Sequence, residues 1–221
     1  MTTTPSPQAH FIVLEGIDGA GTTTQTALLT GRLDHLAQRS IRTREPTDGP
    51  IGVMIRQMLA RRIVLPTSGA DGLQEPMTRE TLAALFAADR LDHVAALIEP
   101  ALARGQHVVC DRYLHSSLAY QGDVEEGGVD YSWILALNSR ARVPDLTCFL
   151  RIDLETSLSR IADRGAARDI YETREKLERL IVRYEEVMEL CASRGDRVLT
   201  LDATLPIDTL HEQIWSAFQA L

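Results

Sequence analysis

Five short strand-like runs, separated by longer stretches with helical periodicity, constrain the fold of this chain more than any other feature. The runs lie at residues 10–16, 41–46, 107–113, 145–153 and 197–203. Segments such as Phe11–Leu14 are apolar at consecutive positions, which is typical of parallel strands that are buried on both faces. Strands that alternate with helices predict an α/β fold with a doubly wound sheet, in which ligands bind at the carboxyl ends of the strands.

Apolar stripes at helical spacing mark two of the intervening stretches. The first lies within residues 171–195, ends at the stop signal Gly195 and comprises Leu177, Leu180, Ile181, Tyr184, Val187, Met188 and Cys191. The second lies near the C-terminus and comprises Ile207, Leu210, Ile214, Trp215 and Phe218. Both stripes are expected to face the hydrophobic core.

Three segments fall outside this alternation. Residues 61–80 are rich in glycine, proline and polar side chains, which favours a long surface loop between helices. Residues 160–172 are charged and contain Gly165, so we expect a mobile flap. The polar residues 1–9 lack the basic-then-apolar pattern of a signal peptide and are expected to be a disordered tail. The remaining residues, 10–221, are expected to form a single domain.

The balance of charge argues against nucleic acid as a partner, because a formal net charge of −8 should repel it. Lys176 is the only lysine, so 22 of the 23 basic residues are arginines, and phosphate binding would depend on guanidinium groups. No segment reaches the length of a transmembrane helix. Cys110, Cys148 and Cys191 are widely spaced and form no C-x-x-C pair. These features predict a cytoplasmic protein with reduced core cysteines, rather than a disulfide or a metal site.

The segment after the first apolar run matches most of the phosphate-binding pattern G-x-x-x-x-G-K-[ST]. Gly16, Gly21 and Thr23 fit the pattern, whereas Thr22 occupies the lysine position. The backbone N–H groups of this loop and the dipole of the following helix can hold an anion. A tight turn without function is an equal alternative on this pattern alone. Asp18 favours phosphate binding, because a carboxylate inside the loop needs a metal, a donor or a substrate hydroxyl.

Two further segments carry side chains suited to nucleotide binding. Asp111 and Arg112 fall at the carboxyl end of a strand, where side chains face the ligand crevice, although a surface ion pair is the alternative. Phe86 and Arg90 lie four residues apart on one helix face, where a core phenylalanine beside a solvated arginine is the alternative. The arginines of residues 160–172 are also compatible with a solvated charged face.

Taken together and in order, five segments resemble the thymidylate kinase family of nucleoside monophosphate kinases. They are "FIVLEGIDGAG", "REPTDGPIG", "LFAADR", "DRYLHSSLAYQG" and "RIADRGAARDIYE", and the resemblance runs from about Phe11 to Tyr184. It implies a P-loop kinase fold with a five-stranded parallel sheet, helices on both faces, and a small arginine-bearing lid at about residues 160–172. It also implies transfer of the γ-phosphoryl group of ATP to dTMP, with Mg²⁺, giving dTDP and ADP.

The same resemblance implies roles for the residues around the acceptor nucleoside. Phe86 would stack on thymine, Arg90 would donate to a base carbonyl, and Ser117 would lie near the base N3. Tyr120 would crowd the sugar 2′ position and so favour deoxyribose. Gln121 is a further expected contact, and its amide leaves open a kinase for another deoxynucleotide.

On the phosphate side, the resemblance implies a second set of contacts. Asp18 would contact the sugar 3′-hydroxyl or the water shell of the metal, and Arg56 and Arg112 would hold the acceptor phosphate. Thr23 and Asp111 would ligate Mg²⁺. Arginine suits this task because its planar guanidinium binds phosphate through two parallel hydrogen bonds.

The resemblance places the ATP phosphates on the loop. The expected contacts are Gly16, Gly19, Ala20, Gly21, Thr22, Thr23 and Thr24. Gly19 lies where eukaryotic members of the family have an arginine. Bacterial members with glycine there supply the arginine from the lid, and Arg164 and Arg168 fit that arrangement as catalytic residues.

A homodimer is implied by the resemblance alone. In the family, the helices after the P-loop and around residues 81–99 pack across a two-fold axis. Exposed apolar side chains at Leu85, Leu91 and Val94 would suit such an interface, but the same residues could equally belong to the core. The expected partners are therefore dTMP, ATP and a second copy of the chain.

Thr22 leaves several hypotheses open. A unit charge about 4 Å from another is worth roughly 4 kcal/mol at an effective dielectric near 20, which is about a thousandfold in rate. The leading hypothesis is an active but slow thymidylate kinase, in which lid arginines and Mg²⁺ replace the lysine; Lys176 is a weaker candidate for this role. The alternatives are a catalytically inactive nucleotide-binding protein and an engineered substitution at Thr22.

Overall fold

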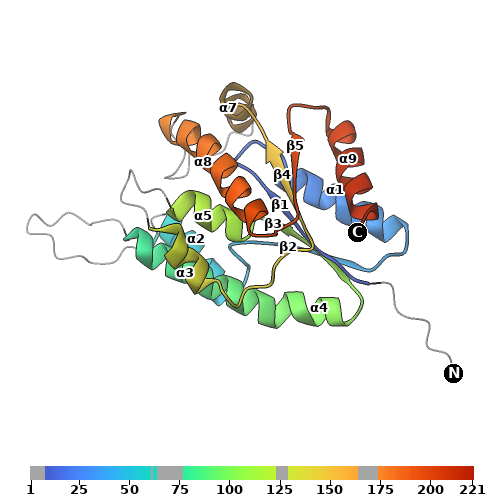
Figure 1. Ribbon diagram of the computed structural model, residues 1–221, viewed down its shortest axis with the longest axis horizontal. Helices are drawn as coiled ribbons and strands as arrows, with labels where there is room; N and C mark the ends of the chain where they lie inside the picture. The colour runs from blue at the N-terminus through green and yellow to red at the C-terminus, as the bar shows by residue number, and fades with distance from the viewer. Residues whose placement is uncertain (1–7, 61, 64–76, 123–128, 164–173) are drawn as a thin grey trace, which may run out of the picture.

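A five-stranded parallel sheet in the order β2-β3-β1-β4-β5 forms the centre of the molecule (Figure 1). The strands are β1 (Phe11–Glu15), β2 (Ser40–Arg44), β3 (His107–Asp111), β4 (Leu146–Arg151) and β5 (Val198–Asp202). The computed structural model describes residues 8–60, 62–63, 77–122, 129–163 and 174–221. All five predicted strands are confirmed to within two residues at each end.

Helices cover both faces of the sheet (Figure 1). In chain order they are α1 (Thr22–His35), α2 (Pro50–Leu59), α3 (Arg79–His93), the π-helical turn η1 (Val94–Ile98), α4 (Glu99–Ala103), α5 (Leu114–Gln121), α6 (Tyr131–Leu137), α7 (Leu154–Asp163), α8 (Arg174–Ser193) and α9 (Ile207–Gln219). Helices α1 and α9 pack together on one face, whereas α5 packs against α3 and α8 on the other. This arrangement confirms the predicted α/β fold.

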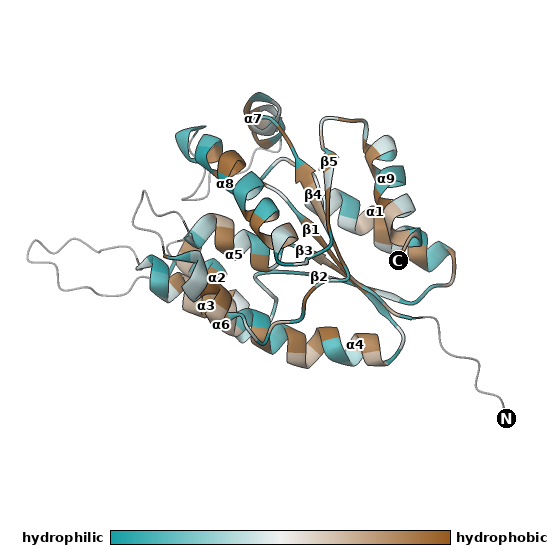
Figure 2. Ribbon diagram, in the orientation of Figure 1, coloured by the Kyte–Doolittle hydropathy of each residue, from teal (hydrophilic) through white to brown (hydrophobic). Residues whose placement is uncertain are grey.

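Strand β1 shows why the predicted strands are apolar at consecutive positions. Its residues are fully buried: Ile12 and Leu14 belong to the larger core cluster, whereas Phe11 and Val13 belong to a smaller one. Because alternate side chains of a strand point to opposite faces, both faces of β1 must be apolar. Figure 2 shows the same division, with apolar strands inside and polar residues on the outer faces of the helices.

The predicted helical stripes lie in the core, with one clear exception. In α8 all the stripe residues are buried except Ile181, which is partly buried. In α9 the stripe is also buried apart from Ile207, which is 56% exposed. The prediction is wrong there because helical side chains lean toward the N-terminus. Ile207 is the first residue of α9, so its side chain leans past the end of the helix.

Two predicted loops are wrong at the ends that the structure describes. Residues 79–80 begin α3, because Thr78 caps this helix and its hydroxyl accepts a hydrogen bond from the Thr81 N–H at 3.2 Å. Residues 160–163 continue α7 and are not part of a flap. Most of both segments, and residues 1–7 of the predicted tail, lie outside the described residues.

The structure places several side chains that the sequence left open. All three cysteines are buried and form no disulfide with one another, which confirms that they belong to the core. Val94 is buried in the smaller core cluster, and Leu85 and Leu91 are partly buried, so Val94 offers no surface for a dimer. Within the described part of the chain, no helix combines the length and apolar character needed to cross a membrane.

Candidate active site

The loop between β1 and α1 has a backbone that favours glycine at two positions. Gly19 and Gly21 have φ angles of 84° and 95°, in the left-handed region. A Cβ atom on Gly19 would lie 2.8 Å from the carbonyl oxygen of Ser157 in α7. A larger residue at Gly19 would therefore be strained and would also push α7 away from the loop.

Helix α7 is tied to this loop by two hydrogen bonds. Ser157 Oγ donates to the carbonyl oxygen of Asp18 at 2.7 Å, and Arg160 Nη1 donates to the carbonyl oxygen of Gly19 at 3.2 Å. The sequence places Arg160 in a flap and predicts no specific role for it. The structure brings its guanidinium to the loop whose pattern lacks a lysine.

The first turn of α1 supplies backbone donors but no side-chain cation. Its leading N–H groups have no acceptor within the helix, as at every helix N-terminus, and point toward the space above the loop. Thr22 is buried, whereas Thr23 and Thr24 are exposed, and Ala20 is buried beneath the loop. The predicted phosphate-binding residues thus form one continuous turn.

The two predicted metal ligands are in contact. Thr23 Oγ1 donates to Asp111 Oδ2 at 2.5 Å, which joins the start of α1 to the carboxyl end of β3. The other carboxylate oxygen, Asp111 Oδ1, is buried and has no hydrogen-bond partner among the described residues. A hydroxyl and a carboxylate are hard oxygen ligands of the kind that Mg²⁺ prefers. The residues present therefore fit a magnesium ion.

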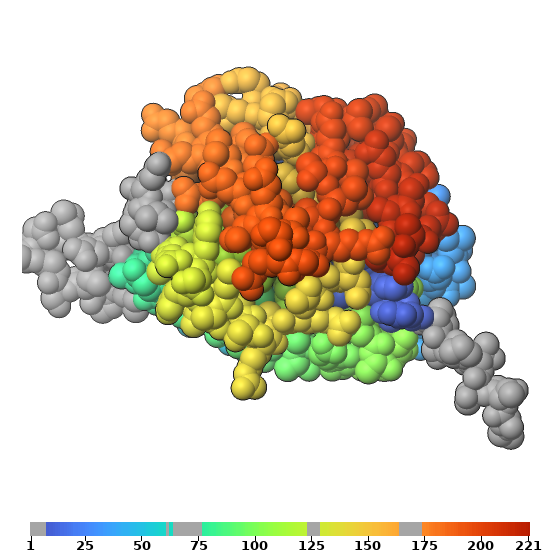
Figure 3. Space-filling model, viewed as in Figure 1, coloured from blue at the N-terminus to red at the C-terminus, as the bar shows by residue number. Residues whose placement is uncertain are grey.

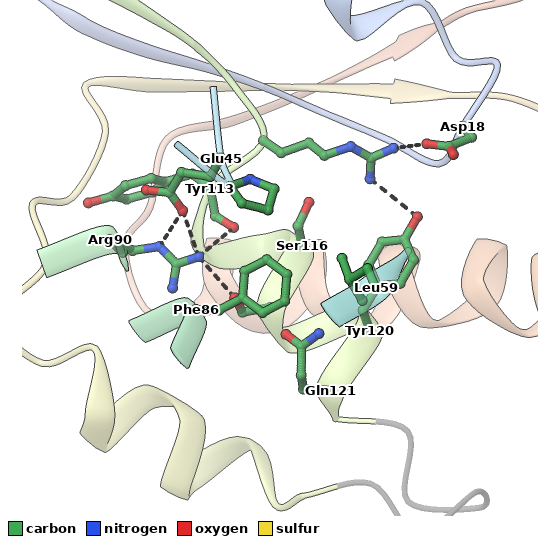
Figure 4. A pocket seen from close by; sticks show the side chains of 12 residues that line it. Asp18, Glu45, Leu59, Phe86, Arg90, Tyr113, Ser116, Tyr120 and Gln121 are labelled. Atoms are coloured by element: carbon green, nitrogen blue, oxygen red, sulfur yellow. Dashed lines mark hydrogen bonds and ion pairs between the residues drawn. The ribbon is translucent and has the colours of Figure 1, made fainter. Parts of the chain in front are cut away.

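A cavity of about 170 Å³ lies beside the loop, between α3 and α5 (Figure 4). It is lined by seven of the eight predicted acceptor-binding residues, namely Asp18, Phe86, Arg90, Arg112, Ser117, Tyr120 and Gln121. The remaining lining residues are Glu45, Pro46, Leu59, Tyr113 and Ser116. Phe86 from α3 and Tyr120 from α5 both face into this space (Figure 4). Residues that are far apart in the sequence thus form one apolar cavity with polar groups at its edges.

Arg90 is fully buried at the base of the cavity, so the alternative of a solvated arginine is wrong. Its Nε donates to Glu45 Oε2 at 2.9 Å and its Nη1 donates to Asn138 Oδ1 at 2.6 Å. Its Nη2 donates to the Tyr113 carbonyl oxygen at 3.1 Å and to Ser117 Oγ at 2.9 Å (Figure 4). Since a guanidinium has five N–H donors, these contacts within the described residues leave one Nη1 proton for a ligand.

Arg112 joins the cavity to the phosphate-binding loop. Its guanidinium forms an ion pair with Asp18 and donates to the hydroxyl of Tyr120 at 3.2 Å (Figure 4). The alternative of a surface ion pair at the strand end is therefore wrong, because Asp111 bonds Thr23 instead. Arg112 has a φ angle of 69°, a strained backbone conformation of the kind found at functional sites.

Comparison with known proteins agrees with this geometry. Residues 14–214 match a protein-family model described as thymidylate kinase. The chain belongs to the thymidylate kinase family. It is 36% identical to the probable thymidylate kinase of Thermococcus kodakarensis over 216 residues, covering 96% of this chain and 98% of the relative. It is 37% identical to the thymidylate kinase of Limosilactobacillus fermentum over 216 residues, covering 96% and 95%. A probable thymidylate kinase of Pyrococcus horikoshii is 45% identical over 158 residues, 72% of each chain.

Membership of the thymidylate kinase family makes the protein a phosphotransferase with the P-loop kinase fold. The match covers both the loop and the acceptor cavity, including every cavity residue from Asp18 to Gln121.

A buried network behind Arg112 is not predicted from the sequence. Tyr184 of α8 is fully buried, and its hydroxyl lies 2.8 Å from Ser116 Oγ, 3.3 Å from Glu15 Oε2 and 3.4 Å from Arg112 Nη1. Glu15 also accepts hydrogen bonds from the N–H of Tyr113 at 2.7 Å and the hydroxyl of Ser116 at 2.7 Å. The signal in this thymidylate kinase sequence is Glu15 itself, a charged residue that continues a buried apolar strand.

The surroundings of this network shift the pKa values of its members. Burial alone would raise the pKa of Glu15, but the neighbouring His115 imidazole and the Ser116 hydroxyl bring it below its usual value. Burial raises the pKa of Tyr184, and the negative charge of Glu15 raises it further. Glu15 is therefore ionised and Tyr184 protonated, which is the pairing needed for Tyr184 to donate a hydrogen bond.

Three predicted site residues are not brought together with the others. Arg56 donates to the carbonyl oxygen of Pro46 at 2.6 Å and to Asp48 Oδ1 at 3.0 Å, and it does not line the cavity. Arg56 therefore contacts the cavity only indirectly, through Pro46, which is one of the lining residues. The predicted lid residues Arg164 and Arg168 lie outside the described residues.

Proposed function

We propose that the protein transfers the γ-phosphoryl group of ATP to dTMP, giving dTDP and ADP. The observation that carries this proposal is the cavity in which Phe86, Arg90 and Tyr120 lie next to Arg112 and the phosphate-binding loop. Base-binding and phosphate-binding groups thus occur within a single nucleotide-sized region. The family match and the names of the relatives support the same substrates.

The acceptor base is held by the inner end of the cavity. The ring of Phe86 stacks on thymine, since offset aromatic stacking suits a flat base. The free Nη1 proton of Arg90 donates to a base carbonyl, and Ser117 Oγ, itself fixed by Arg90, lies near N3. Tyr120 crowds the 2′ position and favours deoxyribose, and Gln121 closes the end of the cavity. These contacts select a pyrimidine deoxynucleotide by shape and hydrogen bonding.

The acceptor phosphate is positioned by Arg112, and Arg56 supplies a second positive charge at the outer rim. Asp18 holds the guanidinium of Arg112 before substrate binds and contacts the sugar 3′-hydroxyl or the metal's water shell afterwards. Phosphoryl transfer needs alignment and neutralisation of charge more than a strong general base. A fixed arginine between the two phosphates meets both needs.

Thr23 and Asp111 hold Mg²⁺, because their oxygen atoms match its preference and Asp111 Oδ1 is buried and unpaired among the described residues. When bound, Mg²⁺ neutralises part of the negative charge of the ATP phosphates. The backbone of the loop, from Gly16 to Thr24, binds the same phosphates through its N–H groups.

Arginines supply the positive charge that the loop lacks at Thr22. Arg160 is the candidate within the described residues, since its Nη1 already lies 3.2 Å from the Gly19 carbonyl oxygen. A guanidinium at this position can turn from the carbonyl to a phosphate without moving α7. Arg164 and Arg168 follow on the same segment and are proposed to act with it.

The test of the proposed function is a coupled assay of ADP formation with dTMP, AMP, CMP and UMP in parallel. We expect dTMP to be preferred, because Tyr120 disfavours ribose, and Arg90 and Ser117 are placed to bind a pyrimidine base. A Phe86→Ala variant should lose most of this preference. A preference for AMP, or equal rates with all four nucleotides, would contradict the proposal. Binding of dTMP without turnover would instead support an inactive nucleotide-binding protein.

A further inference from the structure

A second group of polar side chains lies outside the nucleotide cavity. It consists of His115 in the first turn of α5, Cys191 in the last turn of α8, and Asp196 in the turn before β5. One nitrogen of His115, the sulfur of Cys191 and a carboxylate oxygen of Asp196 all lie within 4.8 Å of one another. None of the three residues lines the nucleotide cavity.

The end of α8 brings Asp196 back over Cys191. Gly195 has a φ angle of 100°, and its N–H donates to the carbonyl oxygen of Ala192 at 3.0 Å. The N–H of Asp196 donates to the carbonyl oxygen of Cys191 at 3.1 Å. These two bonds form a Schellman motif, which reverses the chain at the helix end. In the space-filling view the end of α8 lies against α5 (Figure 3). Helix α5 carries His115.

His115 is buried without a hydrogen-bond partner among the described residues. Its side chain is 1% exposed, and neither ring nitrogen has a partner within hydrogen-bond distance. Nδ1 lies 3.7 Å from Glu15 Oε1, and Nε2 lies 3.8 Å from Asp196 Oδ2. Both contacts are ion pairs that are longer than hydrogen bonds, so a ligand that draws Nε2, Cys191 and Asp196 together would satisfy this buried ring more fully.

We propose that His115, Cys191 and Asp196 bind a divalent transition metal, with Zn²⁺ as the best match. Nitrogen, sulfur and carboxylate oxygen are the three ligand types of zinc in proteins. Zinc bonds of about 2.0–2.3 Å put tetrahedral ligand atoms roughly 3.3–3.8 Å apart, so closure of the group needs the atoms to approach one another by about 1.5 Å or less. Asp196 has a side chain that is 21% exposed, which leaves room for a water molecule as fourth ligand.

Glu15 supports the site from behind. In metal sites the nitrogen of histidine that does not bind the metal usually faces a carboxylate, which fixes the tautomer. Glu15 occupies that position on the Nδ1 side, which leaves Nε2 to face Asp196. The bound metal would join α5, which carries Ser117 and Tyr120 of the cavity, to the end of α8. We therefore expect a stabilising site that takes no part in phosphoryl transfer.

The test uses the full chain without a metal-binding tag. The protein is incubated with Zn²⁺, passed over a desalting column, and analysed for metal by mass spectrometry; Co²⁺ is used in parallel as a spectroscopic probe. We expect about one retained Zn²⁺ per chain and a thiolate-to-cobalt absorption band. Both should be lost in Cys191→Ala and strongly reduced in Asp196→Asn.

Cys148→Ala is the matched control, because Cys148 is equally buried but lies in β4, outside the group. It should keep both the zinc and the cobalt band. Circular dichroism of each variant establishes that it is folded. Folded wild-type protein that retains no metal, or a Cys191→Ala variant that binds metal like wild type, would overturn the proposal. Zinc retention tests the metal site and dTMP-dependent ADP formation tests the proposed function, so the failure of one proposal does not imply the failure of the other.

Discussion

The acceptor side and the donor side of the active site are built in different ways. On the acceptor side, Arg90 is fully buried and is fixed by Glu45, Asn138 and Ser117 through short hydrogen bonds. On the donor side, the loop offers backbone N–H groups, and Arg160 of α7 reaches it through one hydrogen bond to the carbonyl oxygen of Gly19. Under the proposed function, recognition of the base would depend on a buried network, whereas binding of the donor phosphates would depend on charges that approach from outside the loop.

Under the proposed function, this difference would explain why the donor side can have Thr22 in place of the lysine. A phosphate responds mainly to the total positive charge around it, so guanidinium groups from several directions can replace one ammonium group. A base carbonyl needs a donor in one position, and a buried arginine without partners would be strongly unfavourable. We therefore expect substitution of Arg90 in the buried base-binding network to damage the fold, and substitution of the arginines that contact phosphate to change the rate.

The largest effect is expected for Arg90→Ala. It leaves the buried Glu45 carboxylate with His93 but without the guanidinium, and Asn138 and Ser117 each lose a hydrogen bond from Arg90, which should cost about 3–5 kcal/mol of unfolding free energy. Urea denaturation followed by circular dichroism measures this loss. Arg104→Ala on the exposed end of α4 is the control and should change stability by about 0.5 kcal/mol or less. Equal stability of the two variants would show that the acceptor network is not rigid.

Arg112→Ala should leave the fold intact but lower kcat/KM for dTMP by about a thousandfold, because a positioned cation at the transferring phosphate is lost. Steady-state kinetics at varied dTMP concentration measures this loss in kcat/KM. Arg151→Ala is a matched control, since Arg151 also ends a strand but pairs with Glu185 on the surface. A loss of less than about tenfold in Arg112→Ala would contradict its position between the two substrates.

Arg160→Ala tests the donor side and should reduce kcat/KM for ATP by about 100-fold, or about 2.7 kcal/mol, while stability is kept. Adding Thr22→Lys to this variant should restore most of the rate, because both side chains supply charge to the same phosphates. Arg174→Ala should have no effect, since Arg174 reaches α7 only through Glu155 on the surface. If the Arg160→Ala enzyme had the kinetics of wild type, Arg160 would not be the source of the positive charge that Thr22 lacks.

The smallest effect is expected for Tyr184→Phe, which removes the hydroxyl that contacts Ser116, Glu15 and Arg112. Loss of one such bond costs about 1 kcal/mol, so kcat should fall by about tenfold or less. KM for ATP should not change, because the hydroxyl acts through Arg112. If KM for ATP rose while kcat stayed unchanged, Tyr184 would belong to the donor side.

Much of the fold follows from the sequence, because the three central strands, β3, β1 and β4, are buried on both faces and must be apolar. The glycines of the loop and the order of motifs likewise predict the acceptor cavity, whose residues come from the ends of β1 and β3 and from α3 and α5. The start of α3 is missed because the cap Thr78 lies in a segment dominated by turn-forming residues. The exposure of Ile207 is missed because periodicity takes no account of helix ends.

The side-chain networks could not be predicted, since their members are distant in the sequence. Arg90 meets Glu45 and Asn138 only after three elements have packed, so spacing within α3 gives no sign that it is buried. Tyr184 fits an apolar stripe, and the stripe does not show that its hydroxyl reaches Arg112. The same holds for Cys191. Its wide spacing from the other cysteines in the sequence argues against a metal site, but in the folded chain it lies beside His115 and Asp196.

The central claim is that this chain transfers phosphate to dTMP although Thr22 occupies the lysine position. The most direct measurement is dTMP-dependent ADP formation by wild type and Thr22→Lys, at high enzyme concentration with ATP and Mg²⁺. We predict clear turnover by wild type, and a change of about tenfold or less in Thr22→Lys, because arginines already supply the charge. No ADP above background from a wild-type protein that binds dTMP in calorimetry would contradict the claim.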